Sequence, residues 1–203
     1  MSQKRTTTTR SRLLSLGLDT LSAEGLAGLT LGRLATDAQM SKSGLFAHFR
    51  SKEQLQLELL EEATKLADAQ VVAPAMQAQE GLPRLRALFA KWLGWSTRAG
   101  LRGGCPVAAA IFELDDAESS IVRDRVAELD AKWRSLLRSL TIDAIKCRHL
   151  DRSVDPDQIV WELTGIYLAH HASSRFQRDP RARRRAEAAF GELLCRAGAK
   201  ISR

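Results

Sequence analysis

The 203-residue chain has few of the residues that mark secreted, disulfide-bonded or membrane-spanning proteins. Its three cysteines, Cys105, Cys147 and Cys195, are far apart and form no C-x-x-C pair, which excludes a disulfide framework and predicts buried thiols in a reducing compartment. The first ten residues are polar, so we expect no signal peptide. No uncharged apolar run reaches the roughly 18–20 residues that a membrane span needs. We therefore expect a cytoplasmic protein with no membrane partner.

Proline is also scarce, and no segment shows the sustained Val, Ile and Thr alternation of β-strands. Apolar residues recur at helical spacing instead, which predicts an all-α fold of about nine helices. The expected helices cover roughly residues 9–23, 31–38, 42–48, 52–72, 82–98, 107–114, 118–147, 156–178 and 181–197. Residues 1–9 are expected to form a disordered basic tail.

Acidic residues are few in the first quarter of the chain. Residues 1–52 contain eight Lys and Arg against three Asp and Glu, so this segment carries +5 of the total net charge of +7. A compact basic segment on a nearly neutral body predicts a polyanionic partner, most commonly nucleic acid.

Two short predicted helices lie between Thr30 and Phe49, separated by an Ala-Gln-Met tripeptide. Their apolar residues can form one small core with the first helix: Leu31, Leu34, Ala35, Ala38, Met40, Leu45, Phe46 and Phe49. This arrangement predicts a helix-turn-helix, in which the second helix is held by its apolar face and enters the major groove with the other. That free face would carry Lys42, Ser43, Gly44 and His48, because small side chains allow close approach and Lys reaches guanine or phosphate.

Two serines precede neighbouring helix starts. Ser41 would cap the second helix of the pair, and Ser51 with Gln54 forms the S-x-x-Q pattern of a capping box. Each start presents backbone N–H groups and the positive end of a helix dipole, with Lys42 or Lys52 beside it. We interpret the two starts as phosphate anchors on either side of one base-reading face.

The stretch LTLGRLATDAQMSKSGLFAHFRSKEQLQ resembles the DNA-binding domain of the TetR (tetracycline-repressor-like) family. The family pattern has a Thr before the second helix, an Ala-Gly-Val turn, Ser-x-x-x-Leu-Tyr-x-His-Phe and then Ser-Lys-Glu. The resemblance covers about residues 9–58. It implies phosphate contacts from Thr30, His48 and Lys52, and base or backbone contacts from Ser41, Lys42, Ser43 and Phe46.

The chain departs from this pattern at two positions. Gln39 stands where the family has a turn glycine, which would cost about 1 kcal/mol if the position needs a positive φ. Phe46 replaces the family's Tyr, so a hydroxyl bond to phosphate is not available there. The expected organisation is a DNA-binding domain at residues 1–58 and a ligand-binding and dimerisation domain at residues 59–203.

The segment 158–174 carries a single formal charge, Glu162, so the helix expected there is apolar around nearly its whole circumference. One face would pack on the chain's own core and the other on a second copy. We predict a four-helix homodimer interface formed with the last helix. The interface residues expected are Ile159, Leu163, Ile166, His170, Phe190, Leu193 and Leu194. A central core helix in a monomer is the alternative.

Aromatic residues are few but concentrated in the second half. The resemblance implies that they lie on helices around a ligand pocket, which would suit a small, largely apolar effector. The pocket residues predicted on this basis are Phe89, Trp92, Trp95, Cys105, Phe112, Trp133, Tyr167 and His171. Simple core packing is the alternative for each of them.

The sequence shows no Ser/His/Asp set, phosphate loop or metal-ligand spacing, so no catalytic residue, metal or cofactor is predicted. The expected function is a dimeric regulator that binds a palindromic operator. The resemblance to the TetR family implies that it is a repressor, and that an effector releases it by favouring a different spacing of its two DNA-binding heads. A DNA-binding regulator without an effector and an enzyme with the aromatic cavity as active site remain alternatives.

Overall fold

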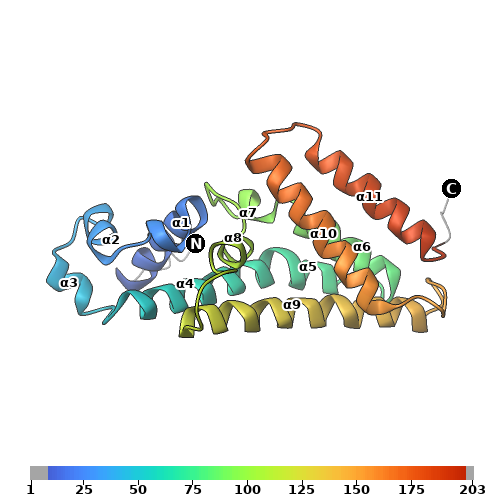
Figure 1. Cartoon of the computed structure of the whole chain (residues 1–203), viewed down its shortest axis with the longest axis horizontal. Helices are drawn as coiled ribbons and strands as arrows, with labels where there is room; N and C mark the ends of the chain where they lie inside the picture. The colour runs from blue at the N-terminus through green and yellow to red at the C-terminus, as the bar shows by residue number, and fades with distance from the viewer. Residues whose placement is uncertain (1–8, 200–203) are drawn as a thin grey trace, which may run out of the picture. The chain divides into compact units, whose positions relative to one another are not determined.

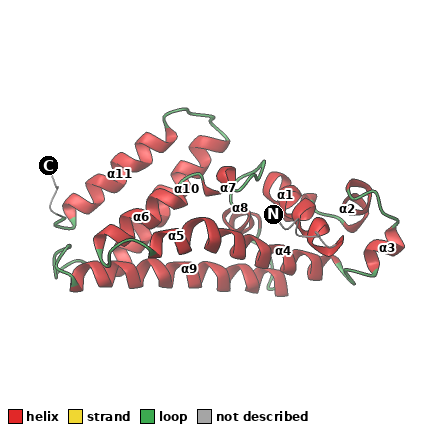
Figure 2. Ribbon diagram, turned by 180° about the vertical axis from the view of Figure 1, so that it is seen from behind, coloured by secondary structure: helices red, strands yellow, loops and turns green. Residues whose placement is uncertain are grey.

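A computed structural model describes residues 9–199 of the chain. Over this range the chain forms eleven α-helices and one π-helix, and no strand (Figure 2). The all-α prediction is therefore confirmed. The expected N-terminal tail lies, apart from Thr9, outside the described residues.

The chain divides into two compact units. The N-terminal unit contains residues up to Leu66 and Gly100–Glu128. Its helices are α1 (Thr9–Gly28), α2 (Leu31–Asp37), α3 (Lys42–Phe46), α4 (Lys52–Ala67), α8 (Pro106–Glu113) and the start of α9 (Ile121–Lys146) (Figure 1). Helix α8 packs on α1, so a segment from the middle of the chain supports the first helix.

The C-terminal unit contains Ala67–Ala99 and the chain from Leu129 onward. Its helices are η1 (Asp68–Val72), α5 (Ala73–Met76), α6 (Leu82–Trp92), α7 (Trp95–Arg98), most of α9, α10 (Pro156–Arg175) and α11 (Ala182–Arg196). Helices α10 and α11 lie side by side in Figure 1 and make the most extensive helix pair. The expected functional boundary at residue 58 stays a prediction.

Two of the nine expected helices are divided in the structure. The helix expected to end before Pro74 continues through the π-helix η1 into α5, where Pro74 occupies an N-terminal position. The π-helical turn interrupts the regular α-helical hydrogen bonds. Pro74 has no N–H to donate, and it is tolerated at the start of α5 for this reason. The helix expected over 82–98 breaks at Leu93 and Gly94, because Gly94 adopts a left-handed φ of 68°.

The expectation of buried thiols is wrong. Cys147 and Cys195 are exposed and Cys105 is half-buried. Cys147 follows the last residue of α9 and Cys195 lies in the last turn of α11, where helix ends meet solvent. None of the helices over residues 9–199 combines the length and apolar character that crossing a bilayer requires.

Candidate nucleic-acid interface

Helices α2 and α3 pack together through a buried apolar face. Leu34 and Ala38 contribute from α2 and its end, Leu45 from α3, and Phe49 from the turn after α3; all four are buried. Helix α3 has only five residues and cannot be stable alone, so these contacts hold it in place. The structure thus contains the two-helix core expected from the sequence.

One residue expected in that core lies outside it. Phe46 is 51% exposed, on the same face as the exposed Lys42, Ser43 and Ala47. The reason is geometric: positions 42, 43, 46 and 47 share one side of a helix, while the buried Leu45 points to the other. The expectation that Phe46 belongs to the core is wrong. Gly44 and His48 are half-buried at the edge of this face.

Both predicted serine caps are present. Ser41 Oγ accepts the N–H of Gly44 at 3.1 Å, and Ser51 Oγ accepts the N–H of Gln54 at 3.1 Å. The reciprocal bond of a capping box differs, because Gln54 Oε1 accepts from the Arg50 N–H at 2.9 Å instead of from Ser51. Hydrogen bonds from its own backbone and from Ser51 lower the pKa of Glu53, which keeps a carboxylate at the start of α4.

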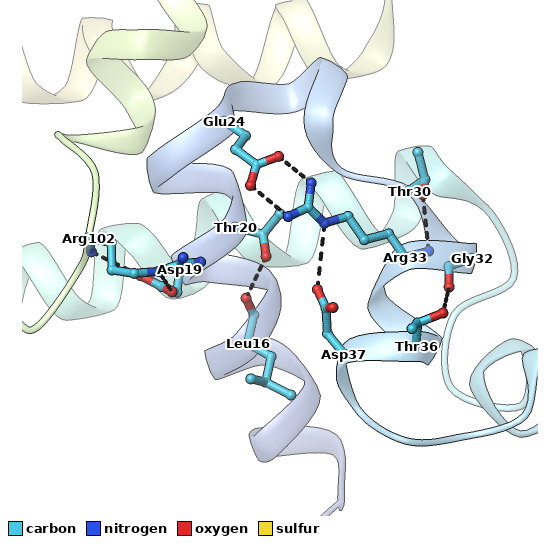
Figure 3. Close-up of polar contacts among 10 residues, drawn as sticks. All are labelled: Leu16, Asp19, Thr20, Glu24, Thr30, Gly32, Arg33, Thr36, Asp37 and Arg102. Atoms are coloured by element: carbon cyan, nitrogen blue, oxygen red, sulfur yellow. Dashed lines mark hydrogen bonds and ion pairs between the residues drawn. The ribbon is translucent and has the colours of Figure 1, made fainter. Parts of the chain in front are cut away.

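The start of α2 is held by a cluster of charged and hydroxyl groups. Thr30 Oγ1 accepts the N–H of Arg33 at 3.1 Å, so Thr30 caps α2 and keeps a hydroxyl proton that can donate to a phosphate. Figure 3 shows the Arg33 guanidinium between Glu24 and Asp37. The hydrogen bond to Glu24, more than the more distant Asp37, raises the pKa of Arg33. Arg33 is therefore engaged with acids of its own unit.

Arg10 was missed by the sequence reasoning and supports the end of α3. Its guanidinium donates to the carbonyl oxygen of His48 at 2.8 Å and forms an ion pair with Glu58. The same group lies 4.9 Å from the centre of the Phe49 ring, within the range of a cation–π contact. Helical periodicity gives no signal for this role, because the partners are 38 or more residues away in the sequence.

The break in α1 is held by α8. Gly25 has a φ of 73° and interrupts the helix. Just beyond it, the N–H groups of Leu26 and Ala27 donate to the carboxylate of Glu113, at 2.7 and 2.5 Å. Glu113 thereby satisfies two backbone donors that the break leaves without helical partners.

The Gly-rich loop before α8 lies directly against α1. Asp19 accepts from the backbone N–H and the guanidinium of Arg102 (Figure 3), and Ser22 Oγ donates to the carbonyl of Gly104 at 2.9 Å. A Cβ on Gly103 would lie 1.7 Å from the Ser22 carbonyl oxygen. Only glycine fits this approach, so the loop is a fixed part of the N-terminal unit.

The C-terminal unit contains a cluster of stacked aromatic rings. Trp92 stacks on Tyr167 with ring centres 4.0 Å apart, and Trp133 meets Trp92 edge-on at 4.9 Å. Phe89 stacks on Phe190 at 4.1 Å. The cluster thus brings together four of the eight predicted pocket residues: Phe89, Trp92, Trp133 and Tyr167. It also contains Phe190, which was expected at the dimer interface.

The other four predicted pocket residues lie apart from these ring contacts or at their edge. Trp95 is buried on α7, and His171 has its ring centre 6.3 Å from that of Tyr167. Cys105 and Phe112 belong to α8 and its start in the N-terminal unit, where Phe112 is 57% exposed. Phe112 is therefore not a member of the ring cluster.

Polar atoms border the ring cluster. Within the described part of the chain, Trp133 Nε1 and His170 Nδ1 are buried without a hydrogen-bond partner. Burial lowers the pKa of both His170 and His171, and the nearby Arg183 and Arg175, respectively, lower it further. Both imidazoles are thus favoured in the neutral form, and Trp133 Nε1 and His170 Nδ1 are buried polar atoms without a partner in the described part of the chain.

Five of the seven residues predicted at a dimer interface are buried within the single chain: Ile159, Leu163, Phe190, Leu193 and Leu194. The surface that α10 and α11 leave open is a groove of about 430 Å³. It is lined by Ile166 and His170, by small residues that include Gly165, Ala169 and Ala186, and by the charged Glu162 and Arg185. Trp161, 66% exposed, stands at this groove. The interface prediction is revised to this groove and stays a prediction.

Two family models match the chain. One, described as bacterial regulatory proteins, tetR family, matches residues 13–59. The other, described as tetracyclin repressor-like, C-terminal domain, matches residues 81–190, which is more than half of the chain. No curated protein is a match by sequence.

Solved structures share the fold at low identity. A TetR transcriptional regulator from Chloroflexus aurantiacus is 22% identical, with a TM-score of 0.80 and 92% of each chain covered. AibR, solved with isovaleryl coenzyme A and operator DNA, is 21% identical, with a TM-score of 0.72 and 92% and 98% of the two chains covered. The ketosteroid transcriptional regulator KstR2 of Mycobacterium tuberculosis is 18% identical, with a TM-score of 0.71 and 97% and 98% covered. Because family models match both its N-terminal and its C-terminal part, the chain belongs to the TetR family of DNA-binding, helix-turn-helix transcriptional regulators.

Proposed function

We propose that this regulator is a cytoplasmic repressor that binds a palindromic operator as a homodimer and leaves it when a small, largely apolar effector binds. The observation that carries the proposal is the exposed face of α3, with Lys42 and Ser43 directed outward while Leu45 and Phe49 are buried. A helix seated in this way can enter a major groove without exposing its apolar side.

In this proposal the DNA contacts divide into positioning and reading groups. Thr30, His48 and Lys52 contact phosphates, and Ser41 completes the cap of α3 beside the backbone. Lys42 and Ser43 face base edges, and Gly44 allows the helix to approach closely. The net charge of +5 over residues 1–52 supplies the attraction to the polyanion.

The homodimer would form through the groove between α10 and α11. The small residues Gly165, Ala169 and Ala186 line it, which allows helices of a second copy to approach closely. Trp161 is a large exposed ring that such contact would cover. A two-fold dimer would place its two α3 helices on half-sites about 34 Å apart, or a multiple of this distance.

The effector would bind at the ring cluster of the C-terminal unit. Stacked rings offer apolar area, and Trp133 Nε1 and His170 Nδ1 offer polar contacts that fix an orientation. AibR, which has the same fold, has been solved with isovaleryl coenzyme A and operator DNA together, the kind of pairing that we propose for this chain. Effector binding would weaken DNA binding because the effector prefers a different head spacing.

The test begins with the full-length protein and a random duplex library, from which bound DNA is selected and sequenced. We expect a palindromic consensus. Lys42→Ala should weaken binding to it by roughly 5- to 150-fold, about 1–3 kcal/mol, the contribution of a side chain that reads a base. The salt dependence should be steep for the wild-type protein.

Lys132→Ala is the matched control, because Lys132 is an exposed lysine on α9 outside the proposed contact face. This variant should keep the wild-type affinity. Selection of no duplex, or equal affinities for wild-type and Lys42→Ala protein, would contradict the proposed contact face. Screening small apolar molecules for release of the selected duplex then tests the effector part of the proposal.

A further inference from the structure

Phe46 is an exposed aromatic ring on the face of α3 that we assign to DNA. Four other large apolar side chains are strongly exposed among the described residues: Phe112, Ile121, Trp161 and Phe176. None of those four lies on α2 or α3. Phe46 follows Lys42 by four residues, so the two side chains share one stripe of the helix. The apolar ring is therefore part of the same surface as the cationic group.

A phenyl ring has no hydrogen-bond donor or acceptor, so Phe46 cannot bond to a phosphate oxygen or to the polar atoms of base edges. The major groove offers one apolar group on its base edges, the C5-methyl of thymine. Contact with that methyl removes apolar area of both partners from water. Among the groups on the base edges, the phenyl ring can therefore make a favourable contact only with the thymine methyl.

We propose that Phe46 packs against the C5-methyl of a thymine and makes thymine the preferred base at one position of each half-site. The inference rests on the proposed contact face and adds a base identity to it. It also replaces the phosphate contact that a tyrosine hydroxyl would make at this position.

The surrounding contacts keep the backbone of α3 in a defined place. Leu45 and Phe49 are buried on either side of Phe46 in the sequence, so rotation of α3 about its axis is restricted. Ser41 caps one end of the helix and Arg10 holds the carbonyl of His48 at the other. Because the helix that carries the ring is held at both ends, little backbone freedom remains to be lost on binding, and the ring is presented from a fixed position.

The spacing on the helix also bounds the position of the thymine. Four residues of α-helix span about 6 Å, at 1.5 Å per residue. Successive base pairs are about 3.4 Å apart along one strand. The thymine should therefore lie within roughly two base-pair steps of the base or phosphate that Lys42 contacts.

The experiment uses the full-length protein and the duplex that it selects from a random library. Each thymine of that duplex is replaced singly by deoxyuridine, which removes only the methyl, and the dissociation constant is measured by fluorescence anisotropy at fixed salt. For the wild-type protein we expect one thymine per half-site at which deoxyuridine weakens binding about fourfold, the effect of roughly one buried methylene. In Phe46→Ala the same replacement should have no effect.

Phe176→Ala is the matched control, because Phe176 is 90% exposed and lies at the end of α10, in the other unit of the chain. This variant should retain the full methyl effect. Phe46→Leu keeps an apolar side chain and should retain part of it, and it serves as the second variant if thermal unfolding shows that Phe46→Ala is misfolded.

The outcomes separate the inference from the function on which it rests. A selected duplex that tolerates deoxyuridine at every thymine would overturn the role of Phe46 and leave DNA binding intact. A methyl effect of equal size in wild-type and Phe46→Ala protein would assign the methyl contact to another residue and would also overturn it. Failure to select any duplex would instead contradict the proposed function.

Discussion

Gln39 occupies a backbone conformation that non-glycine residues rarely adopt. Its φ is 55°, and its N–H donates to the carbonyl of Thr36 at 3.0 Å as the chain leaves α2. In the TetR pattern a glycine stands here, and the cost expected for Gln39 depended on whether the position needs a positive φ. The observed angle shows that residue 39 adopts the left-handed conformation although it is not glycine. A Cβ in this region of the backbone map brings strain.

We expect Gln39→Gly to raise the free energy of unfolding by about 1 kcal/mol. The left-handed conformation costs a residue with a Cβ about 1–2 kcal/mol, and the larger entropy of glycine in the unfolded chain offsets part of the gain. Chemical denaturation measures the change. Gln77→Gly is the control, because Gln77 has a φ of −76° and glycine brings no relief there. A gain of equal size in both variants would contradict the strain at Gln39.

At the scale of the element, α3 depends on side chains outside itself. A helix of five residues contains too few hydrogen bonds to form alone, so its stability comes from Leu45, from the Ser41 cap and from Arg10. The Ser41 cap could be predicted from the sequence, because a cap joins residues only a few positions apart. The role of Arg10 was not visible, because its partners His48 and Glu58 are distant in the chain.

We expect Arg10→Ala to lower the free energy of unfolding by about 1 kcal/mol and to speed amide hydrogen exchange at His48 and Phe49. The variant loses one hydrogen bond to a carbonyl and an ion pair that is partly exposed to solvent. Exchange followed by NMR reports the local effect. Arg12→Ala removes an exposed arginine of the same helix and should leave exchange at these two residues unchanged; equal acceleration in both variants would argue against the positioning role.

Helix α10 should give the protein a pH-dependent stability. Burial, more than the neighbouring charges, lowers the folded-state pKa of His170 and His171; Arg183 and Arg175 add to this, and Glu187 opposes it for His170. The unfolded chain binds protons first, near the ordinary histidine value of about 6.5. Stability that is present above this pH is therefore lost as the pH falls below it.

We expect the free energy of unfolding to decrease between about pH 6.5 and pH 5 in the wild-type protein, and the double variant His170→Gln/His171→Gln to have a shallower slope over the same range. Chemical denaturation at closely spaced pH values measures both slopes. The comparison uses slopes, so a constant loss of packing in the variant does not affect it. Equal slopes in the two proteins would show that these two histidines do not cause the pH dependence of stability.

At the scale of the whole molecule, the sequence predicted the all-α fold and seven of the nine helices as single elements. It also predicted the core that α2 and α3 share in the N-terminal unit. These features depend on periodicity, caps and apolar spacing, which act over a few residues. Contacts between distant segments could not be read in this way: Glu113 on the break of α1, Gly103 against Ser22, and the stacking of Phe190 on Phe89. Burial of five predicted interface residues within the chain was not foreseen for the same reason, since periodicity identifies an apolar face but not the neighbour that covers it.

Assembly into a dimer should depend on the open groove of α10 and α11. We expect Trp161→Asp to convert the proposed dimer to a monomer, because the variant loses the large apolar ring and burying a carboxylate in the interface carries a desolvation cost. Sedimentation velocity measures the oligomeric state, and far-UV circular dichroism checks the fold. Ile121→Asp changes another exposed apolar residue, 62% accessible on α9, and should leave the dimer intact. A stable dimer in both variants would exclude the groove as the interface.

The distribution of indole and phenol side chains has a practical consequence. All four tryptophans, at positions 92, 95, 133 and 161, and the single tyrosine, Tyr167, belong to the C-terminal unit. The head that carries α3 has neither, so it contributes no intrinsic fluorescence of either kind. Any change in protein emission when operator DNA is added must then arise in the C-terminal unit. Fluorescence of the unlabelled protein therefore reports whether DNA binding by the N-terminal unit alters the C-terminal unit.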